Sequence, residues 1–382
     1  MKKILLIGLY GTYNYGCEAI VRGAVEILKH KYQGACTITI ATPRVKDDTQ
    51  RLEGCEISVS LRKINRYKLS NIVRKVLTKV GINFPVVIED TAQLDGYDAV
   101  YSVGGDIYTL DHRGEAPLNF MAFGDYCLKN NIPYSMLCCS IGPFKENREL
   151  EKYIVPHLQR ITKIYAREYH TIAYLKSIGV EKNVTYLPDP AFQVEKLIFK
   201  KERSASVSTI GINLSPLSAV HFYPSLDDAI KIQADNIISI IQSGDYSVKL
   251  LPHVKSEDAV DDDFSYLQRI YDLVYQAVGN KVELCSDDVG FIKRKHNIMS
   301  CDFIIAARMH CAINAICCNV PTIFLSYSQK AKGMAELIYG NNKFAVDLKG
   351  FEDIASIISL YDELPNFRDK VEELQCLSNY KI

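Results

Sequence analysis

The sequence predicts an α/β protein of two domains, each a doubly wound parallel sheet with helices on both faces, that face each other across a cleft. Three observations predict this fold. Short apolar runs typical of buried strands recur along the chain. Stretches with helical spacing of apolar residues separate them, and this alternation favours parallel sheets. The chain has 382 residues, enough for two domains with sizeable cores.

The N-terminal domain is expected over residues 1–195. Its strands are predicted at 3–9, 37–41, 57–61, 99–103, 134–139, 164–166 and 184–187. Its helices are predicted at 19–32, 116–130, 149–161 and 169–177. The charged, serine-rich stretch 196–208 is typical of a linker, so we expect the first domain to end before it.

The C-terminal domain is expected over residues 205–382, with strands at 209–214, 247–252, 281–284, 302–307, 320–325 and 343–346. A last helix, at about 351–379, could cross back onto the first domain. Five carboxylates at 257–263 precede a helical run at 264–278. Because acids complement the dipole at the start of a helix, we interpret this run as capping. Calcium binding is the alternative, although the spacing matches no known loop.

Composition narrows the class of protein. The chain has 45 basic and 45 acidic residues, which argues against wholesale nucleic-acid binding. Its apolar content of 48% and charged content of 24% are typical of a soluble globular protein. Twelve cysteines without a C-x-x-C pair argue against a zinc site and favour reduced thiols. No run approaches the ~18 to 20 apolar residues of a membrane span, so we expect a cytoplasmic location.

One segment is strongly basic. Residues 62–79 carry seven Lys and Arg and no acid, and within them apolar residues repeat at helical spacing from Leu69 to Val80. A basic amphipathic helix can lie on an anionic membrane surface. The alternative is a domain helix with its basic side in water.

The strongest candidate site follows two strands of the second domain. Arg308 and His310 end the strand at 302–307, and Lys330 follows the strand at 320–325. Ligands of parallel sheets gather at the carboxyl ends of strands. Arginine suits carboxylates and phosphates, and histidine can move a proton near neutral pH. This set predicts a site for a small anion, and an interface cluster paired with acids is the alternative.

Polar residues also follow other predicted strands. Four of them, Arg167, Asn213, Ser215 and His253, end strands where a phosphate or other ligand would lie. Arg167 could instead pair with the neighbouring Glu168. Asp189 lies in a Pro-Asp-Pro turn, where its role could be entirely structural.

Two glycine-containing turns complete the candidate set. The first, which follows the first strand, contains Asn14, Gly16 and Glu18, and such turns let backbone amides reach an anion. The second contains Gly104, Gly105 and Asp106 after the strand at 99–103, where glycines permit close approach to a ligand. Asp106 could bind a sugar hydroxyl, act as a base or cap a turn. His112 follows in a polar loop that could line the same side.

These motifs together resemble a known family. The opening Asn14-Tyr15-Gly16-Cys17-Glu18-Ala19-Ile20, the glycine pair Gly104-Gly105, and Arg308-Met309-His310 followed by the P-x-I-x-x-x-Y-x-x-K run that ends at Lys330 resemble the polysaccharide pyruvyl transferases. The resemblance extends over residues 5–335. The expected arrangement of domains is similar to the glycosyltransferase B architecture.

The resemblance implies transfer of a pyruvyl group from phosphoenolpyruvate to two hydroxyls of a sugar, giving a cyclic ketal and phosphate. For this reaction we expect catalysis by His310, Arg308 and Asp106, and donor binding by Arg167, Arg308, Lys330, Asn213, Ser215 and His253. On the acceptor side we expect Asn14, Gly16, Glu18, Gly104, Gly105, Asp106 and His112. No metal or cofactor is expected beyond phosphoenolpyruvate as co-substrate.

The expected acceptor is a polysaccharide precursor in capsule or exopolysaccharide synthesis, carried by a lipid. The segment from Leu69 to Val80 would then contact the inner face of the membrane. Two alternatives stay open: a glycosyltransferase of the same architecture that uses a nucleotide-sugar, and a glycan- or anion-binding subunit without activity.

Overall fold

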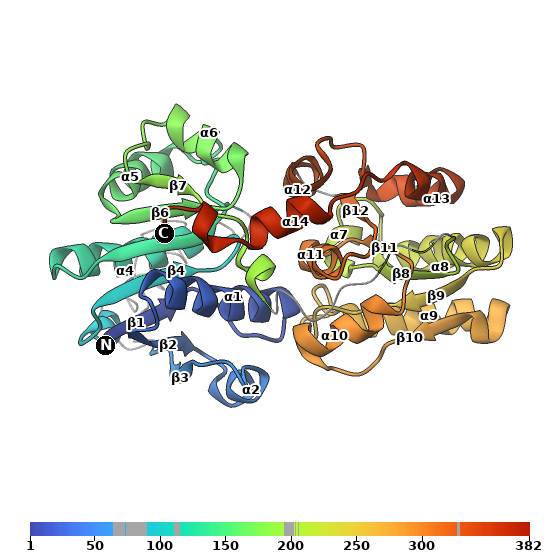
Figure 1. Ribbon diagram of the computed structural model, residues 1–382, viewed down its shortest axis with the longest axis horizontal. Helices are drawn as coiled ribbons and strands as arrows, with labels where there is room; N and C mark the ends of the chain where they lie inside the picture. Colours follow the sequence, from blue (N-terminus) through green and yellow to red (C-terminus); the bar gives the residue numbers. More distant parts are fainter. Residues whose placement is uncertain are drawn as a thin grey trace. The chain divides into compact units, whose positions relative to one another are not determined.

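The protein is described here by a computed structural model that covers residues 1–63, 73, 90–110, 115–194, 202, 204, 206–326 and 329–382. The chain divides into two compact units (Figure 1). Unit 1 contains Met1–Thr12, Ile20–Pro190 and Leu377–Ile382. Unit 2 contains Tyr13–Ala19 and Ala191–Cys376. The short segment Tyr13–Ala19 therefore groups with unit 2, although the sequence places it among N-terminal residues.

Unit 1 is built on a seven-stranded parallel sheet in the order β3-β2-β1-β4-β5-β6-β7. The strands are β1 Lys2–Ile7, β2 Cys36–Thr42, β3 Ser58–Leu61, β4 Ala99–Val103, β5 Tyr134–Cys139, β6 Lys163–Ala166 and β7 Val184–Tyr186. The order reverses direction between β1 and β4, where Ile4 is paired with Ala99. Such a reversal leaves room for a ligand at the carboxyl ends of the strands.

The helical segments that accompany this sheet are α1 Tyr15–Lys31, α2 Val45–Arg51, η1 Thr91–Leu94, α4 Glu115–Lys129, α5 Arg148–Arg160 and α6 Tyr169–Ser177. Helix α5 begins where the Asn147 side chain accepts a hydrogen bond from the Leu150 amide at 3.1 Å. Strands β4 and β5 are buried at every residue, as expected for a sheet covered on both faces.

Unit 2 is built on a six-stranded parallel sheet in the order β10-β9-β8-β11-β12-β13. The strands are β8 Thr209–Asn213, β9 Ser247–Leu250, β10 Val282–Leu284, β11 Phe303–Ala306, β12 Thr322–Ser326 and β13 Ala345–Asp347. The order reverses between β8 and β11, where Ile304 is paired with Gly211. The loops after β8, β9 and β11 therefore meet at one edge of this sheet.

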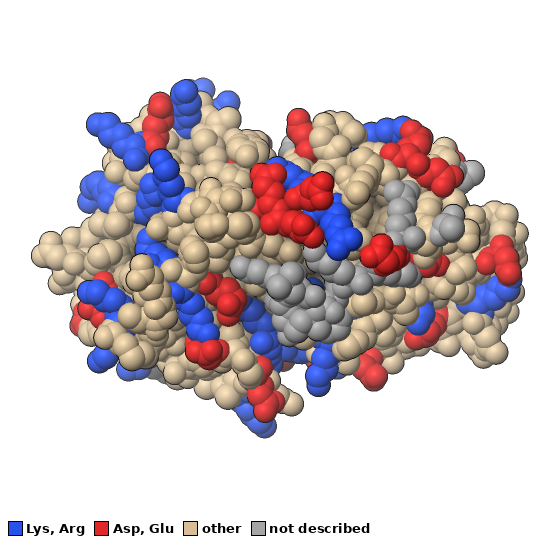
Figure 2. Space-filling view, viewed as in Figure 1, with Lys and Arg blue, Asp and Glu red and all other residues tan. Residues whose placement is uncertain are grey.

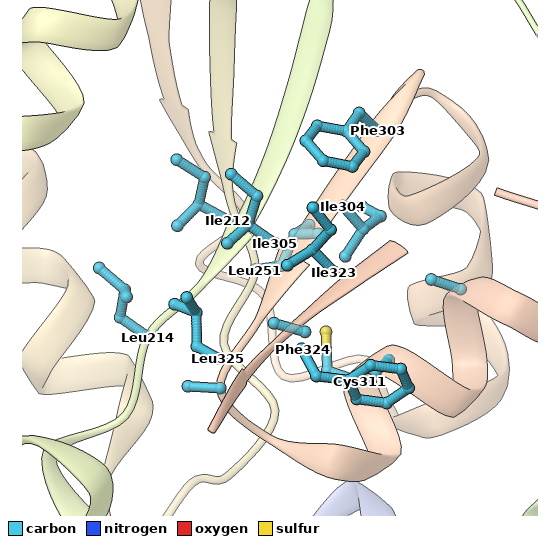
Figure 3. Close-up of a cluster of buried hydrophobic side chains, with 14 of the residues drawn as sticks. Ile212, Leu214, Leu251, Phe303, Ile304, Ile305, Cys311, Ile323, Phe324 and Leu325 are labelled. Atoms are coloured by element: carbon cyan, nitrogen blue, oxygen red, sulfur yellow. The ribbon is translucent and has the colours of Figure 1, made fainter. Parts of the chain in front are cut away.

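The helices of unit 2 are α7 Pro216–Ala219, α8 Leu226–Ser243, α9 Asp263–Val278, α10 Gly290–Met299, α11 Met309–Cys317, α12 Gln329–Tyr339, α13 Ile354–Glu363 and α14 Arg368–Gln375. Unit 2 also contains the short helical turns η3 Gly279–Lys281 and η4 Leu348–Glu352. The turn η2 Pro190–Gln193 begins at the last residue of unit 1 before unit 2, and η5 Leu377–Asn379 belongs to unit 1. Figure 3 shows part of the core, where side chains of β8, β11, β12 and α11 gather. Because seven of the nine residues of α11 are buried and six of these are apolar, packing in this core fixes the helix that carries the candidate site.

Each predicted strand has a counterpart with slightly shifted bounds, and the prediction of two parallel-sheet α/β domains is confirmed. The single last helix predicted at 351–379 is wrong. The structure has η4, α13, α14 and η5 instead, and Pro365 lies in the break after α13. A proline lacks the amide that a continuing helix needs and disfavours helical geometry in the residue before it.

Among the described residues, no helix combines the length and hydrophobicity that crossing a membrane requires. Figure 2 shows basic and acidic side chains interspersed on one face of the molecule. Most of the basic segment from Leu69 to Val80 lies outside the described residues, so the proposed membrane helix stays a prediction.

Candidate functional site

The N-terminal glycine turn is part of unit 2. Asn14 forms an antiparallel bridge with Val254, and the Tyr15 amide donates to the carbonyl of His253 at 3.0 Å. The Asn14 side chain then accepts a hydrogen bond from the Gly16 amide at 2.8 Å, which tightens the turn. The turn is therefore fastened to the loop that follows β9, and it reaches the carboxyl edge of the second sheet.

Gly16 provides the surface on which His310 rests. A β-carbon at Gly16 would lie 2.4 Å from Nδ1 of His310 and 2.7 Å from its Cγ. Any side chain at this position would displace the imidazole, because real β-carbons essentially never approach so closely. Since His310 is the second residue of α11, the helix holds the ring from one side and the glycine from the other.

Glu18 is buried and serves as an anchor. Its Oε2 accepts a hydrogen bond from the Phe291 amide at 2.8 Å, at the start of α10. A carboxylate at this position satisfies an amide that the helix leaves without a partner and complements the helix dipole. The predicted acceptor-side residue thus joins the segment Tyr13–Ala19 to α10 within unit 2.

Arg308 is the N-terminal cap residue of α11 and is held by two acids. Its Nη2 lies 2.8 Å from Oδ1 of Asp263 and 2.9 Å from Oδ1 of Asp261, and Nε donates to Asp263 at 3.0 Å. Burial raises the pKa of Asp263, although the Arg308 guanidinium opposes this effect. Desolvation thus outweighs the attraction for this carboxyl group, as is common for buried ion pairs.

Asn213 links three strand ends. At the end of β8, its Nδ2 donates to the carbonyl of Leu251 at 2.8 Å, and its Oδ1 accepts from the Arg308 amide at 2.8 Å. The Asn213 side chain is fully buried. Its amide therefore fixes the backbone that presents Arg308 rather than reaching into solvent.

Two other predicted site residues have buried polar side-chain atoms that form no hydrogen bond among the described residues. His253 is buried, and neither ring nitrogen has a hydrogen-bond partner among the described residues. Burial and the nearby Arg294 hold the pKa of His253 well below its usual range, so the ring is neutral. The Oγ of Ser215 is likewise buried without a partner in the described part of the chain. Buried polar atoms without partners are uncommon and point to a ligand or water.

Lys330 is the second residue of α12, which follows β12, and it is half-buried. Strand β12 is the neighbour of β11, so Lys330 follows the strand next to that of Arg308. The residues between β12 and α12, 327 and 328, lie outside the described part of the chain.

Unit 1 contains a second cluster, centred on Arg167. The guanidinium lies 2.7 Å from Asp189, 3.4 Å from Glu168 and 3.5 Å from Asp106, and it donates to Ser140 at 3.0 and 3.2 Å. The arginine and Asp189 are buried. These three carboxylates raise the pKa of Arg167 despite its burial, which keeps it charged.

The second glycine turn lies beside this cluster. A β-carbon at Gly105 would come within 3.0 Å of Nη2 of Arg167, so the glycine lets the guanidinium approach the backbone. Gly104 has a φ of 135°, a conformation that other residues rarely adopt. Asp106 is about one-third exposed, at 34%. His112, predicted on the same side, lies outside the described residues.

Sequence reasoning missed several residues of the unit 2 site. Asp261 and Asp263 were assigned to capping, but among the acids of that run it is Asp262 whose side chain caps α9, by accepting from the Ser265 amide at 2.9 Å. Tyr15 and Arg294 were also missed. The tyrosine hydroxyl donates to Asp288 at 2.8 Å, and its ring lies 5.4 Å from that of His253. The position of Tyr15 inside the N-terminal motif could have identified it as a site residue from the sequence.

The fold and these strand-end clusters define a two-domain α/β protein with polar groups gathered at the carboxyl ends of its parallel strands. The model of the polysaccharide pyruvyl transferases matches residues 14–329, and the chain belongs to this family of enzymes. The match includes both glycine turns and the Arg308-Met309-His310 motif, and it confirms the resemblance seen in the sequence. None of the curated proteins compared with the chain matches it.

Several solved structures share the fold. Alr3699/HepE from Anabaena, in complex with UDP and glucose, has a TM-score of 0.59 at 14% identity, covering 98% of this chain and 94% of that one. A putative UDP-N-acetylglucosamine 2-epimerase from Listeria monocytogenes has a TM-score of 0.57 at 13% identity, covering 97% and 93%. The lipopolysaccharide outer core galactosyltransferase WaaB has a TM-score of 0.54 at 10% identity, covering 97% and 94%. At these identities the likeness shows the glycosyltransferase-B-like fold alone.

Proposed function

We propose that the protein transfers a pyruvyl group from phosphoenolpyruvate to two hydroxyls of a sugar in a polysaccharide precursor. The observation that carries the proposal is the placement of His310. Its imidazole lies at the start of α11, beside Arg308, and rests on Gly16 of the family motif. A ring held from two sides can deliver a proton to one fixed point.

The reaction requires a proton at the methylene carbon of the donor. Protonation there leaves a cationic carbon at C2, which one sugar hydroxyl attacks with loss of its proton. Phosphate then leaves with uptake of a proton and regenerates the cation. The second hydroxyl attacks this cation, loses its proton and closes the cyclic ketal. We assign the first proton transfer to His310, with Arg308 beside it stabilising the negative charge of the donor.

The donor is a carboxylate and a phosphate on one small molecule, so it needs several fixed polar groups. We assign donor binding to Arg308, Lys330, Arg167, Asn213, Ser215 and His253. Two of these support the assignment most directly, since the Ser215 hydroxyl and the neutral His253 ring have unused hydrogen-bonding atoms at strand ends. Arg308 and Arg167 already bind carboxylates, so a donor anion would share or replace those contacts.

On the acceptor side we assign Asp106 as the group that binds or deprotonates a sugar hydroxyl. Its side chain is partly exposed beside Gly104 and Gly105, whereas that of Glu18 is buried against the Phe291 amide. Asn14, Gly16, Glu18 and His112 stay in the proposed acceptor set. We assign Glu18 and Gly16 an indirect part there, through the backbone and the imidazole that they position.

The wider setting is proposed on the family alone. The acceptor would be a lipid-linked oligosaccharide for capsule or exopolysaccharide, met at the cytoplasmic face of a membrane through the segment from Leu69 to Val80. The reaction as written consumes phosphoenolpyruvate as co-substrate and requires no metal or further cofactor.

Calorimetric titration tests the donor. Phosphoenolpyruvate is titrated into the native protein and into Arg308→Ala and His310→Ala, with UDP-hexoses as competing candidates. We expect phosphoenolpyruvate to bind the native protein, Arg308→Ala to weaken that binding, and His310→Ala to retain it while losing turnover. Binding of a UDP-hexose without any response to phosphoenolpyruvate would replace the proposal with a glycosyltransferase that uses a nucleotide-sugar.

A further inference from the structure

Two cations of α10, Arg294 and Lys295, are buried in unit 2 at 1% exposure each. In the part of the chain that the structure describes, neither forms an ion pair with a carboxylate. Arg294 donates to the carbonyls of Cys285 and Asp287 at 3.0 and 2.8 Å. Lys295 donates to the side-chain oxygen of Asn314 at 2.7 Å.

These two differ from the arginines that the family motifs highlight. Arg308 and Arg167 each bind a buried carboxylate directly, so much of their charge is neutralised. The acceptors of Arg294 and Lys295 are uncharged, and Nε of Arg294 is buried without a partner among the described residues. A buried charge with uncharged partners is costly, and such groups are found where function requires them.

Each buried cation lies one side chain away from a histidine of the candidate site. The Arg294 guanidinium lies 5.7 Å from the centroid of the Tyr15 ring, and that ring lies 5.4 Å from the ring of His253. Lys295 binds Asn314, which is one turn after His310 on the same face of α11. Helix α10 therefore places Arg294 next to a ring that contacts His253, and Lys295 next to a residue one turn away from His310. Figure 1 shows helices α10 and α11.

Two carboxylates also face this group of side chains. Glu18 binds the Phe291 amide, and Asp288, on the exposed loop before α10, binds the Tyr15 hydroxyl. Within the described part of the chain, neither acid forms an ion pair with Arg294 or Lys295. The charges of α10 are therefore not quenched by direct contact, and in a buried region they act over several ångströms.

We propose that Arg294 and Lys295 are specificity-determining residues that select a multiply charged anion for the His253–His310 site. Their charges create a positive electrostatic potential at that site without contacting the donor. Arg308, whose charge is paired with carboxylates, contributes a direct and oriented contact instead. This inference rests on the proposed function, because phosphoenolpyruvate is the anion that the proposal assigns to the site. It names two residues outside the motifs that carry the family resemblance.

The test compares charge-removing variants along one helix. Arg294→Met and Lys295→Met each remove a buried cation, and Lys293→Met removes the exposed cation next to them and is the matched control. Phosphoenolpyruvate, inorganic phosphate, UDP and the monoanion pyruvate are titrated into each variant by calorimetry at fixed ionic strength. Arg294→Lys keeps the charge and loses the planar fork.

We expect Arg294→Met and Lys295→Met each to weaken binding of phosphoenolpyruvate by about 10- to 100-fold, corresponding to about 1.4 to 2.8 kcal/mol. The preference, meaning the ratio of the affinity for phosphoenolpyruvate to that for pyruvate, should decrease in both variants. The affinity of Lys293→Met and of Arg294→Lys for phosphoenolpyruvate should stay within about threefold of that of the native protein. A purely structural role would lower the thermal midpoint without changing this preference. Unchanged preference in both folded methionine variants, or in Lys295→Met alone if Arg294→Met does not fold, would overturn the inference.

The panel also separates this inference from the proposed function. If phosphoenolpyruvate fails to bind but phosphate or UDP binds and loses affinity in Arg294→Met, the buried cations select anions and the donor assignment falls. If phosphoenolpyruvate binds equally to native protein and both methionine variants, the donor assignment stands and the inference falls. If no anion binds the native protein, both fall.

Discussion

The two units place an arginine and a histidine at the same kind of position, but the two histidines have different neighbours. In unit 1 the strand β6 ends in Ala166, and Arg167 follows; in unit 2 the strand β11 is followed by Ala307 and Arg308. Each arginine binds a buried aspartate, at 2.7 Å in unit 1 and 2.8 Å in unit 2. Each is followed by a helix whose second residue is a histidine, at 170 and 310 respectively.

The histidines show what the difference teaches. His170 is 49% exposed and lies 2.9 Å from the Glu168 carboxylate, so its partner is a neighbouring side chain at the surface. His310 rests instead on Gly16, a residue of a segment far away in the sequence. A strand–helix turn can place a histidine where a ligand binds. Whether the ring has the fixed orientation that proton transfer needs depends on the residues that surround it.

The largest expected effect is on His310. Replacement by Asn should lower turnover about 10²- to 10⁴-fold, because a general acid contributes about that much. The KM for phosphoenolpyruvate should change much less. The matched variant His170→Asn, at the same helical position in unit 1, should keep both parameters within about twofold; steady-state kinetics measures both. Equal losses in the two variants would contradict the contrast between the histidines.

The next largest effect is expected on stability, from the aspartates that bind Arg308 and Arg167. Asp263→Asn leaves Arg308 without its buried carboxylate, and Asp189→Asn does the same to Arg167. Each should lower the free energy of unfolding by about 1.5 to 3 kcal/mol, because the buried arginine loses its shortest charged hydrogen bond but keeps its other carboxylate partners. Asp261→Asn removes a more exposed partner and should cost about 1 kcal/mol. Urea denaturation measures all three, and equal costs for Asp261→Asn and Asp263→Asn would sink this ranking.

Gly16→Ala tests whether the close contact between Gly16 and the His310 imidazole is needed for turnover. The added β-carbon must push His310 away, and a displacement of about 1 Å can cost about 100-fold in turnover. Gly34→Ala is the control, because this glycine has a φ of 74° and nothing within 4 Å of an added β-carbon. It should lower stability by about 1 kcal/mol and leave kinetics unchanged. Native turnover in Gly16→Ala would show that His310 needs no such contact.

The smallest effect concerns pH. Burial, together with Arg294, holds the pKa of His253 below that of the unfolded chain, about 6.5. As pH falls below about 6.5, the unfolded state binds a proton that the folded state does not, so stability decreases by up to about 1.4 kcal/mol per pH unit. His253→Gln should make this decrease shallower in denaturation curves recorded between pH 7 and pH 5. Identical slopes would contradict a neutral, buried His253.

The sequence predicted much of the fold because apolar strands and amphipathic helices alternate along it. It failed where a local pattern continued through a break, as at Pro365 after α13. The acidic run 257–263 shows the same limit for the site. Its composition predicted a cap, which Asp262 provides, but the pairing of Asp261 and Asp263 with Arg308 depends on residues 45 or more positions away.

By itself, the sequence determined the two parallel-sheet domains, the family and the strand-end positions of Arg167, Arg308 and His310, because these follow from local periodicity and short motifs. Only the tertiary structure decided that Asn14, Gly16 and Glu18 belong to unit 2 and that Gly16 contacts His310. It also decided that Arg294 and Lys295 are buried and that, among the described residues, neither has a carboxylate partner. The physical reason is that burial, ion pairing and close approach depend on neighbours in space, and chain folding brings those neighbours from distant parts of the sequence.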